Sequence, residues 1–213
     1  MRKFLATFFV LSIFSGCLLA FEGNIQLTKQ SQYDTTYLIF YVKDSKARVD
    51  EFDESGQLTK TLLIDLITEN IVALSPSLKL FTNVARYNNS PTKTDKQFDV
   101  LKTNNFKLIE GKKCYQWRVR NRLLDSEITY WVMESEMQFM VKLYSILDAA
   151  ENYSSIPSFY FQIPESEGFV PVLAVERNLV REQKQSMKVT SINERKVSGR
   201  IFEIPKDYRN LRM

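Results

Sequence analysis

Two predicted strands in this sequence are apolar on both faces, and this feature constrains the fold more than any other. The run YLIFYV at residues 37–42 is aliphatic or aromatic at every position, and LLIDLI at residues 62–67 is nearly so. An antiparallel sheet with one side in water would carry polar residues at every second position. Both faces must therefore be covered. We expect helices on one face, and on the other a second layer, a partner, an apolar ligand or the rest of the fold.

Short β-type runs separated by turn signals make up most of the chain. Turns such as Asp44-Ser45 and Glu54-Ser55-Gly56 join runs that are rich in β-branched and aromatic residues. Because hairpin follows hairpin, we predict an antiparallel sheet. The predicted strands are residues 21–29, 34–43, 46–52, 58–67, 71–74, 78–84, 106–109, 113–120, 128–133, 169–180, 184–193 and 200–204.

One segment, residues 139–150, follows a helical period instead. Its apolar residues fall at i, i+3, i+4 and i+7, which predicts a helix packed on the sheet. These residues are Met140, Leu143, Tyr144 and Leu147. A lid or a hydrophobic arm is the alternative interpretation of the same stripe.

Two other segments break the strand pattern. TDKQ at residues 94–97 fits a capping box and predicts a short helix, with Phe98 and Leu101 behind it. Residues 153–168 contain two prolines and are expected to form an ordered loop. The sequence has no linker and no repeat, so residues 21–213 are predicted to form a single domain.

The opening segment is typical of an export signal. Arg2 and Lys3 precede an apolar run, and small residues follow it, so residues 1–20 are predicted to be a signal peptide that is cut after Ala20. The alternative is a lipoprotein signal with lipid on Cys17, but the residues after Cys17 are apolar and do not form a polar tether. We expect an exported protein of the periplasm or cell envelope of a Gram-negative bacterium, an outer-membrane lipoprotein in the alternative case. The mature chain has no run long enough for a transmembrane span.

The residue types present exclude several kinds of chemistry. The chain has no histidine, which removes the commonest general base and metal ligand. Cys114 lies in a strand-like run and is interpreted as a buried structural residue. The acidic cluster at residues 49–56 lacks the spacing of a calcium loop and is interpreted as a hairpin tip. Positive and negative charges are mixed along the chain, which argues against a nucleic-acid partner. We therefore predict no catalytic residues, no metal site and no cofactor.

Several stretches of the mature chain together resemble a known group of proteins. They are FEGNI at 21–25, YVKDSKARVD at 41–50, ID at 64–65 with ALSP at 73–76, GKKC at 111–114 leading into Trp117, and IFEIPKDY at 201–208. The pattern resembles an uncharacterised bacterial envelope family with a fold similar to the lipoprotein-localisation carriers (LolA-type). The resemblance implies an α+β, mainly β fold, in which an open, curved antiparallel sheet forms a half-barrel around one to three helices. It also implies an apolar cavity for acyl chains.

Two functions follow as hypotheses. The first is a non-enzymatic envelope protein that binds an apolar ligand, a lipid or a lipidated partner, in the concavity of the sheet. The side chains expected to face that ligand are Tyr37, Ile39, Tyr41, Leu63, Trp117 and Tyr130. The alternative is a structural or protein-interaction module of the envelope whose interior is filled by its own side chains. A ligand-sized apolar pocket, roughly 300 Å³ or more, would distinguish the first from the second.

Overall fold

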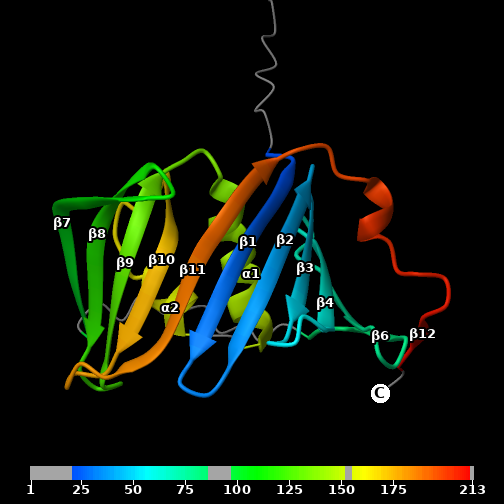
Figure 1. The fold of residues 1–213 in the computed structure, drawn as a ribbon, viewed down its shortest axis with the longest axis horizontal. Helices are drawn as coiled ribbons and strands as arrows, with labels where there is room; N and C mark the ends of the chain where they lie inside the picture. Colours follow the sequence, from blue (N-terminus) through cyan, green and yellow to red (C-terminus); the bar gives the residue numbers. More distant parts are fainter. Residues whose placement is uncertain (1–20, 86–96, 152–154, 212–213) are drawn as a thin grey trace, which may run out of the picture.

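A computed structural model describes residues 21–85, 97–151 and 155–211 of the chain. The predicted signal peptide, with Cys17, lies outside these residues. One large, curved sheet dominates the described part, and two helices lie behind it in the view of Figure 1. The helices occupy the concave side of the sheet. The predicted fold, an open and curved antiparallel sheet around one to three helices, is confirmed.

The strands and helices follow one another in the order in which Figure 1 labels them. The strands are β1 (Gly23–Ser31), β2 (Thr35–Lys43), β3 (Lys46–Phe52), β4 (Leu58–Asp65), β5 (Ile71–Ser75), β6 (Leu80–Asn83), β7 (Phe98–Ile109), β8 (Lys112–Asn121), β9 (Ser126–Glu134), β10 (Phe169–Arg177), β11 (Gln183–Glu194) and β12 (Arg209–Asn210). The helices are α1 (Gln138–Glu151), α2 (Ser155–Tyr160) and the short 3-10 helix η1 (Gly199–Phe202).

The sheet runs in the order β12-β6-β5-β4-β3-β2-β1-β11-β10-β9-β8-β7. Only the pairing of β12 with β6 is parallel. β1 lies in the middle of the sheet between β2 and β11, so an early and a late segment of the chain meet there. Hairpin connections produce most of the other pairs. The turn between β7 and β8, for example, has positive φ at Glu110 (48°) and Gly111 (73°), which suits a two-residue hairpin.

Three of the predicted segments differ from the structure. The strand predicted at residues 200–204 is one of them, because Gly199–Phe202 form the 3-10 helix η1. Phe98 and Leu101 belong to β7, so the helix predicted behind residues 94–97 does not include them, and residues 94–96 lie outside the described ranges. Cross-strand pairing with β8, such as Val100 opposite Val119, outweighs the local capping signal. Residues 155–160, expected in a loop, form α2, most of whose side chains are buried. Burial therefore determines this helix more than intrinsic propensity does.

The C-terminal segment covers part of the outer face of the sheet. After β11 the chain crosses to the outer, convex face of β3, where η1 packs, and it ends as β12 beside β6 (Figure 1, red). Arg48 on that face donates a 2.9 Å hydrogen bond to the carbonyl oxygen of Ile201, and Lys43 donates one of 3.0 Å to that of Val197. Phe202 is 9% exposed. The C-terminal segment thus covers the second face at β3, while Tyr37 on the outer face of β2 stays 44% exposed.

Candidate functional site

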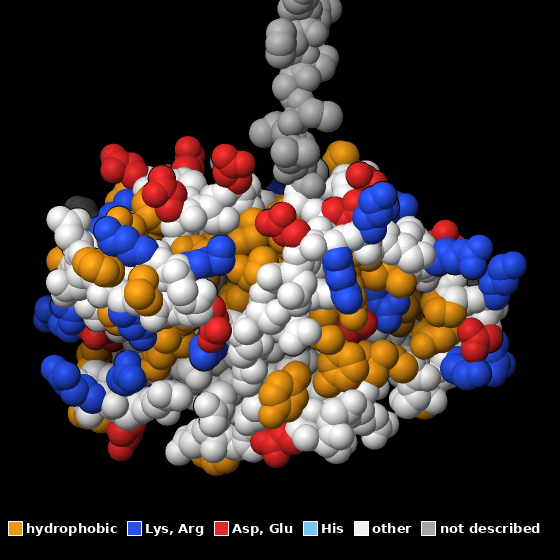
Figure 2. Space-filling view, turned by 45° about the horizontal axis from the view of Figure 1, so that its top comes forward, with side chains coloured by type: hydrophobic (Ala, Val, Ile, Leu, Met, Phe, Trp, Pro, Cys, Tyr) orange, Lys and Arg blue, Asp and Glu red, His pale blue; other side chains and the backbone are white. Residues whose placement is uncertain are grey.

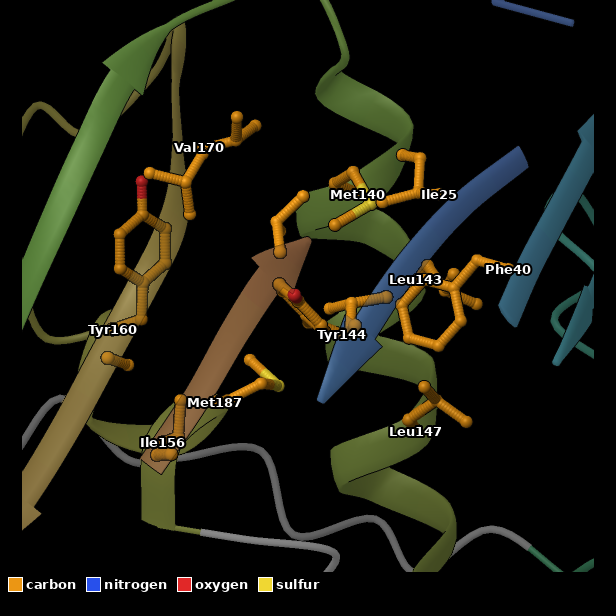
Figure 3. Close-up of a cluster of buried hydrophobic side chains, with 14 of the residues drawn as sticks. Ile25, Phe40, Met140, Leu143, Tyr144, Leu147, Ile156, Tyr160, Val170 and Met187 are labelled. Carbon is orange, nitrogen blue, oxygen red and sulfur yellow. The ribbon is translucent and has the colours of Figure 1, made fainter. Parts of the chain in front are cut away.

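The concave face of the sheet is the place where the sequence predicted a ligand, and α1 occupies it. Side chains that alternate along the strands, such as Phe40 on β2 and Ile25 on β1, point toward this helix (Figure 3). The predicted helical stripe is confirmed, because each of its members is at most 3% exposed: Met140, Leu143, Tyr144 and Leu147. The Phe40 and Tyr144 rings meet edge to face, with centroids 6.3 Å apart. Helix side chains therefore fill the concavity.

One small gap remains between α1, α2 and the strands β1, β2 and β11. Its free space for a water-sized sphere is about 10 Å³, which is about the minimum for one water molecule. The surface that walls this gap is apolar, although Lys29 and Tyr144 are among its lining residues. The lining residues are Lys29, Leu38, Phe40, Tyr144, Leu147, Ile156, Pro157 and Met187. A drug-sized or acyl ligand needs a space of roughly 300 Å³ or more, so this gap is far too small for one.

The three buried tyrosines of this region differ in how their hydroxyls are bonded. Tyr130 donates a 2.6 Å hydrogen bond to the carbonyl oxygen of Ile156, and Tyr160 donates one of 2.8 Å to that of Phe169. The Tyr144 hydroxyl is buried and has no hydrogen-bond partner among the described residues. Burial raises the pKa of each phenol, and the charge of Glu176 raises that of Tyr130 further. Tyr144 is thus the one polar group of this interior whose bonding is incomplete within the described ranges.

A buried carboxylate closes one end of the concave face. Glu176 on β10 is 5% exposed and accepts hydrogen bonds from Ser126 (2.6 Å), from Gln185 (2.6 Å) and from Ser155 at the start of α2. Gln185 also donates to the Ser155 hydroxyl at 3.0 Å. These donors satisfy the carboxylate, as burial requires. The network fixes α2 to the sheet, which is a structural role.

Larger hollows lie outside the core, on either side of the loop at residues 161–168. One has about 460 Å³ and the other about 430 Å³. Both are open at the surface, and Ser166 and Glu167 line both of them. Neither is the enclosed apolar cavity that the resemblance implied.

The six side chains predicted to face an apolar ligand do not share one face of the sheet. Trp117 and Tyr130 lie opposite each other on β8 and β9, point toward the helices and are 5% and 0% exposed. The other four alternate with core residues and so lie on the outer face. They are Tyr37, Ile39, Tyr41 and Leu63. That any of the six contacts a ligand stays a prediction.

Two features of this interior were missed at the level of sequence. Lys29 follows Ile25 and Leu27 in the alternation of β1, so the period alone could have placed it on the core face. The unpartnered hydroxyl of Tyr144 has no sequence signal, because its surroundings come from α2 and three strands. Cys114 is buried as predicted, with 0% exposed, and burial raises the pKa of its thiol.

The described residues offer no cluster for a metal ion, since no group of three or more Cys, Asp or Glu side chains converges within them. Within the same ranges, no helix combines the length and the hydrophobicity that crossing a bilayer requires.

Comparison with known proteins identifies a family and similar folds. A family model described as a domain of unknown function (DUF4412) matches residues 21–208. No curated protein matches the chain. An uncharacterised conserved protein from Thermus thermophilus has a similar fold, with a TM-score of 0.54 and 10% identity over 90% of this chain and 91% of that one. A structure of the Pseudomonas aeruginosa MucA/MucB complex has a TM-score of 0.50 and 8% identity over 89% of this chain and 58% of the matched one.

A domain from Vibrio parahaemolyticus, described as an outer membrane lipoprotein-sorting protein, matches with a TM-score of 0.33 and 7% identity over 84% of this chain and 87% of that one. A TM-score of 0.33 is too low to establish a shared fold. The likenesses at TM-scores of 0.54 and 0.50 show a shared fold and nothing more specific.

Proposed function

The chain belongs to the family described as a domain of unknown function (DUF4412), and from that premise we propose that it is an exported, non-enzymatic module of the bacterial cell envelope. We infer that its interior is closed by its own helices and that it works through its outer surface, as a structural or interaction module. The observation that carries this proposal is the filled concavity, where only about 10 Å³ stays free beside Tyr144 and Leu147.

The chemistry of the chain supports a non-enzymatic role. The sequence has no histidine, and Cys114 is buried with a raised thiol pKa, so it is a poor nucleophile. The carboxylate of Glu176 is engaged by three hydrogen-bond donors that tie α2 to the sheet. The opening segment, residues 1–20, supports export. One similar fold occurs in a protein complex, MucA/MucB, which supports a protein partner.

A second candidate function is the binding of an acyl chain in the gap beside α1. The unpartnered Tyr144 hydroxyl favours it, because a buried hydroxyl without a partner is a feature that a ligand's polar group could satisfy. In this case α1 or α2 must move to admit the ligand, since the gap itself is smaller than any acyl chain.

Titration with a fluorescent fatty acid distinguishes the two. The filled-interior proposal predicts no saturable binding to the wild-type protein. The variant Leu147→Ala serves as the comparison, because removing a large side chain that is 2% exposed opens space beside the gap and should create weak binding of the probe. Saturable binding to the wild-type protein that Tyr144→Phe weakens would overturn the proposal and support the acyl-chain function.

A further inference from the structure

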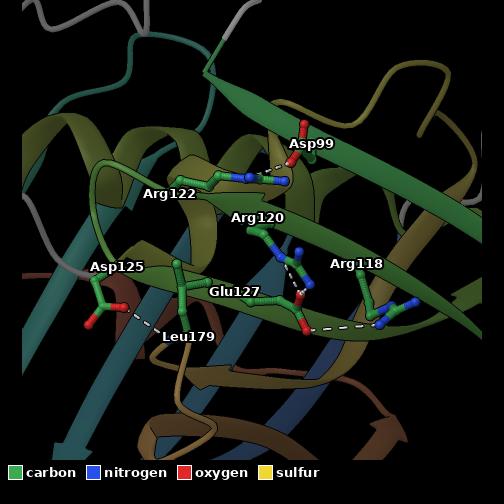
Figure 4. A network of polar contacts seen from close by, with 7 residues as sticks. All are labelled: Asp99, Arg118, Arg120, Arg122, Asp125, Glu127 and Leu179. Atoms are coloured by element: carbon green, nitrogen blue, oxygen red, sulfur yellow. Dashed lines mark hydrogen bonds and ion pairs between the residues drawn. The ribbon is translucent and has the colours of Figure 1, made fainter.

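Two turns lie side by side at one end of the sheet. One joins β8 to β9 through residues 122–125, and the other joins β10 to β11 through residues 178–182. The Asp125 carboxylate accepts a 3.0 Å hydrogen bond from the backbone N–H of Leu179 (Figure 4). The backbone carbonyl oxygen of Asp125 accepts a second one, of 2.6 Å, from the ammonium group of Lys184. We call residues 122–125 and 178–182 together the turn tip. These bonds make it one connected surface.

The turn tip exposes four large aliphatic side chains where polar turn residues would be usual. Leu123 and Val180 are each 76% exposed, Leu124 is 58% exposed and Leu179 is 41% exposed. The first turn is held in shape, because the buried Asn121 side chain accepts hydrogen bonds from the backbone N–H groups of Leu123 (3.0 Å) and Leu124 (3.1 Å). Single exposed aliphatics are ordinary, but four on two adjoining, hydrogen-bonded turns form a patch.

An arginine-rich groove of about 480 Å³ adjoins the turn tip on the outer face of the sheet. Its lining includes five arginines and a single glutamate, so its charge is strongly positive. The residues are Gln116, Arg118, Arg120, Arg122, Glu127, Thr129, Arg177, Asn178, Leu179 and Arg181. Leu179 belongs both to this groove and to the exposed aliphatic patch, which makes the two surfaces continuous.

The acidic side chains here neutralise only part of this charge. Glu127 lies between Arg120 and Arg177 in the strand register and accepts a 2.7 Å hydrogen bond from Arg120. Arg118 lies 4.0 Å from the same carboxylate, as Figure 4 shows. Arg177 and Arg181 form no ion pair within the described parts of the chain. Guanidinium groups in such a setting suit bidentate binding of phosphate.

The opposite end of the sheet carries acidic and basic side chains together, since the exposed Lys112 and Lys113 lie beside Glu110, which forms an ion pair with Lys188 at 3.6 Å. Exposed glutamates gather where β7 turns into β8, where β9 ends and where β10 begins, and Figure 2 shows acidic side chains along this upper edge. They are Glu110, Glu134, Glu136, Glu165 and Glu167.

We propose that the turn tip docks on an anionic phospholipid membrane, with its aliphatic side chains in the interfacial layer and the groove arginines on lipid phosphates. The order of the groups along the strands supports a membrane over an acidic protein partner. The aliphatics are at the tips, where Arg122, Asp125, Arg181 and Glu182 also lie. Arg120 and Arg118 lie back along β8, about 7 Å apart at the rise of a strand. This order matches a bilayer, in which phosphates lie outside the hydrocarbon. This inference rests on the proposed function only in one respect, which is that the protein acts through its outer surface.

Co-sedimentation of the chain from residue 21 with vesicles tests the docking. We expect binding to vesicles of phosphatidylglycerol with phosphatidylcholine and none to phosphatidylcholine alone. Raising the ionic strength to about 1 M should release the protein, because salt screens arginine–phosphate attraction.

Paired variants locate the contact. Leu123→Ser with Val180→Ser removes the two most exposed aliphatic side chains of the turn tip. Arg177→Gln with Arg181→Gln removes the two groove arginines that form no ion pair with any described residue. Each pair should lower vesicle affinity by at least about tenfold. The matched control combines Ile67→Ser, at a side chain 78% exposed at the other end of the sheet, with Lys206→Gln on the exposed C-terminal segment. It should bind as the wild type does, and all variants should keep the wild-type melting temperature.

Three outcomes would overturn the docking proposal: no binding to the anionic vesicles, equal binding to the neutral ones, or binding that the control weakens as much as the turn-tip variants do. Capture of an acidic protein without vesicle binding would overturn it in favour of a protein partner. Its failure is distinguishable from failure of the proposed function, because fatty-acid binding in the interior is measured without vesicles and does not involve the turn tip.

Discussion

The hydroxyl of Tyr130 donates a 2.6 Å hydrogen bond to the backbone carbonyl oxygen of Ile156, and this bond joins β9 of the sheet to the first turn of α2. Both residues are at most 2% exposed, so the carbonyl has no access to water. Tyr130→Phe should leave that acceptor unsatisfied and lower the free energy of unfolding by about 1–3 kcal/mol. Urea unfolding followed by circular dichroism measures the change. A loss below about 0.5 kcal/mol would contradict the role given to this bond.

Tyr144 provides the matched case, since its hydroxyl is buried without a partner in the described ranges. Tyr144→Phe removes a polar group that gains nothing from burial. We expect the free energy of unfolding to stay unchanged or to rise by up to about 1 kcal/mol. If the same urea experiment shows a clear loss of stability, the hydroxyl must have a partner in solution, such as a bound molecule.

The cover on the outer face can be tested at Phe202. Phe202→Ala removes most of a side chain that is 9% exposed and lies on the segment that crosses β3, so it should cost about 3 kcal/mol of stability. Ile204→Ala, at a side chain 37% exposed, is the control and should cost less than about 1 kcal/mol. Similar losses for the two variants would show that the segment is not packed as described.

Alkaline pH should destabilise the protein through its buried tyrosines. The pKa values of Tyr130, Tyr144 and Tyr160 are raised, chiefly by burial. Above the usual tyrosine pKa of about 10, the unfolded chain therefore loses protons that the folded chain keeps. The stabilising contribution is complete below that pH and is lost as the pH rises above it. Phenolate absorbance and circular dichroism should show these three phenols ionising only as the fold is lost. Ionisation of all ten tyrosines before any unfolding would contradict this.

Sequence periodicity predicted much of this fold because the relevant contacts are local or repeat regularly. The β-branched and aromatic content of residues 37–42 located β2, and the stripe from Met140 to Leu147 located α1 and its buried face. α2 was missed because Ile156 and Phe159 are buried by strands distant in sequence, and no local pattern records that burial.

The site was harder to predict, since it depends on which elements meet. The observation that both faces of β2 are apolar was correct, but the sequence did not reveal that residues 195–211 cover part of the outer face of the sheet, at β3. Arg120 and Arg177 are far apart in the chain, and only the strand register brings them to either side of Glu127. The arginine-rich groove therefore could not be recognised from the scattered charges of the sequence.

The central claim is that the concave interior is filled by the protein's own helices and holds no ligand. Native mass spectrometry of the protein, expressed from its full sequence and purified gently, tests it most directly. The account predicts one species, with the mass of an unliganded chain that begins at Phe21. A species that is heavier by the mass of a lipid, and that loses this mass on denaturation, would contradict the claim.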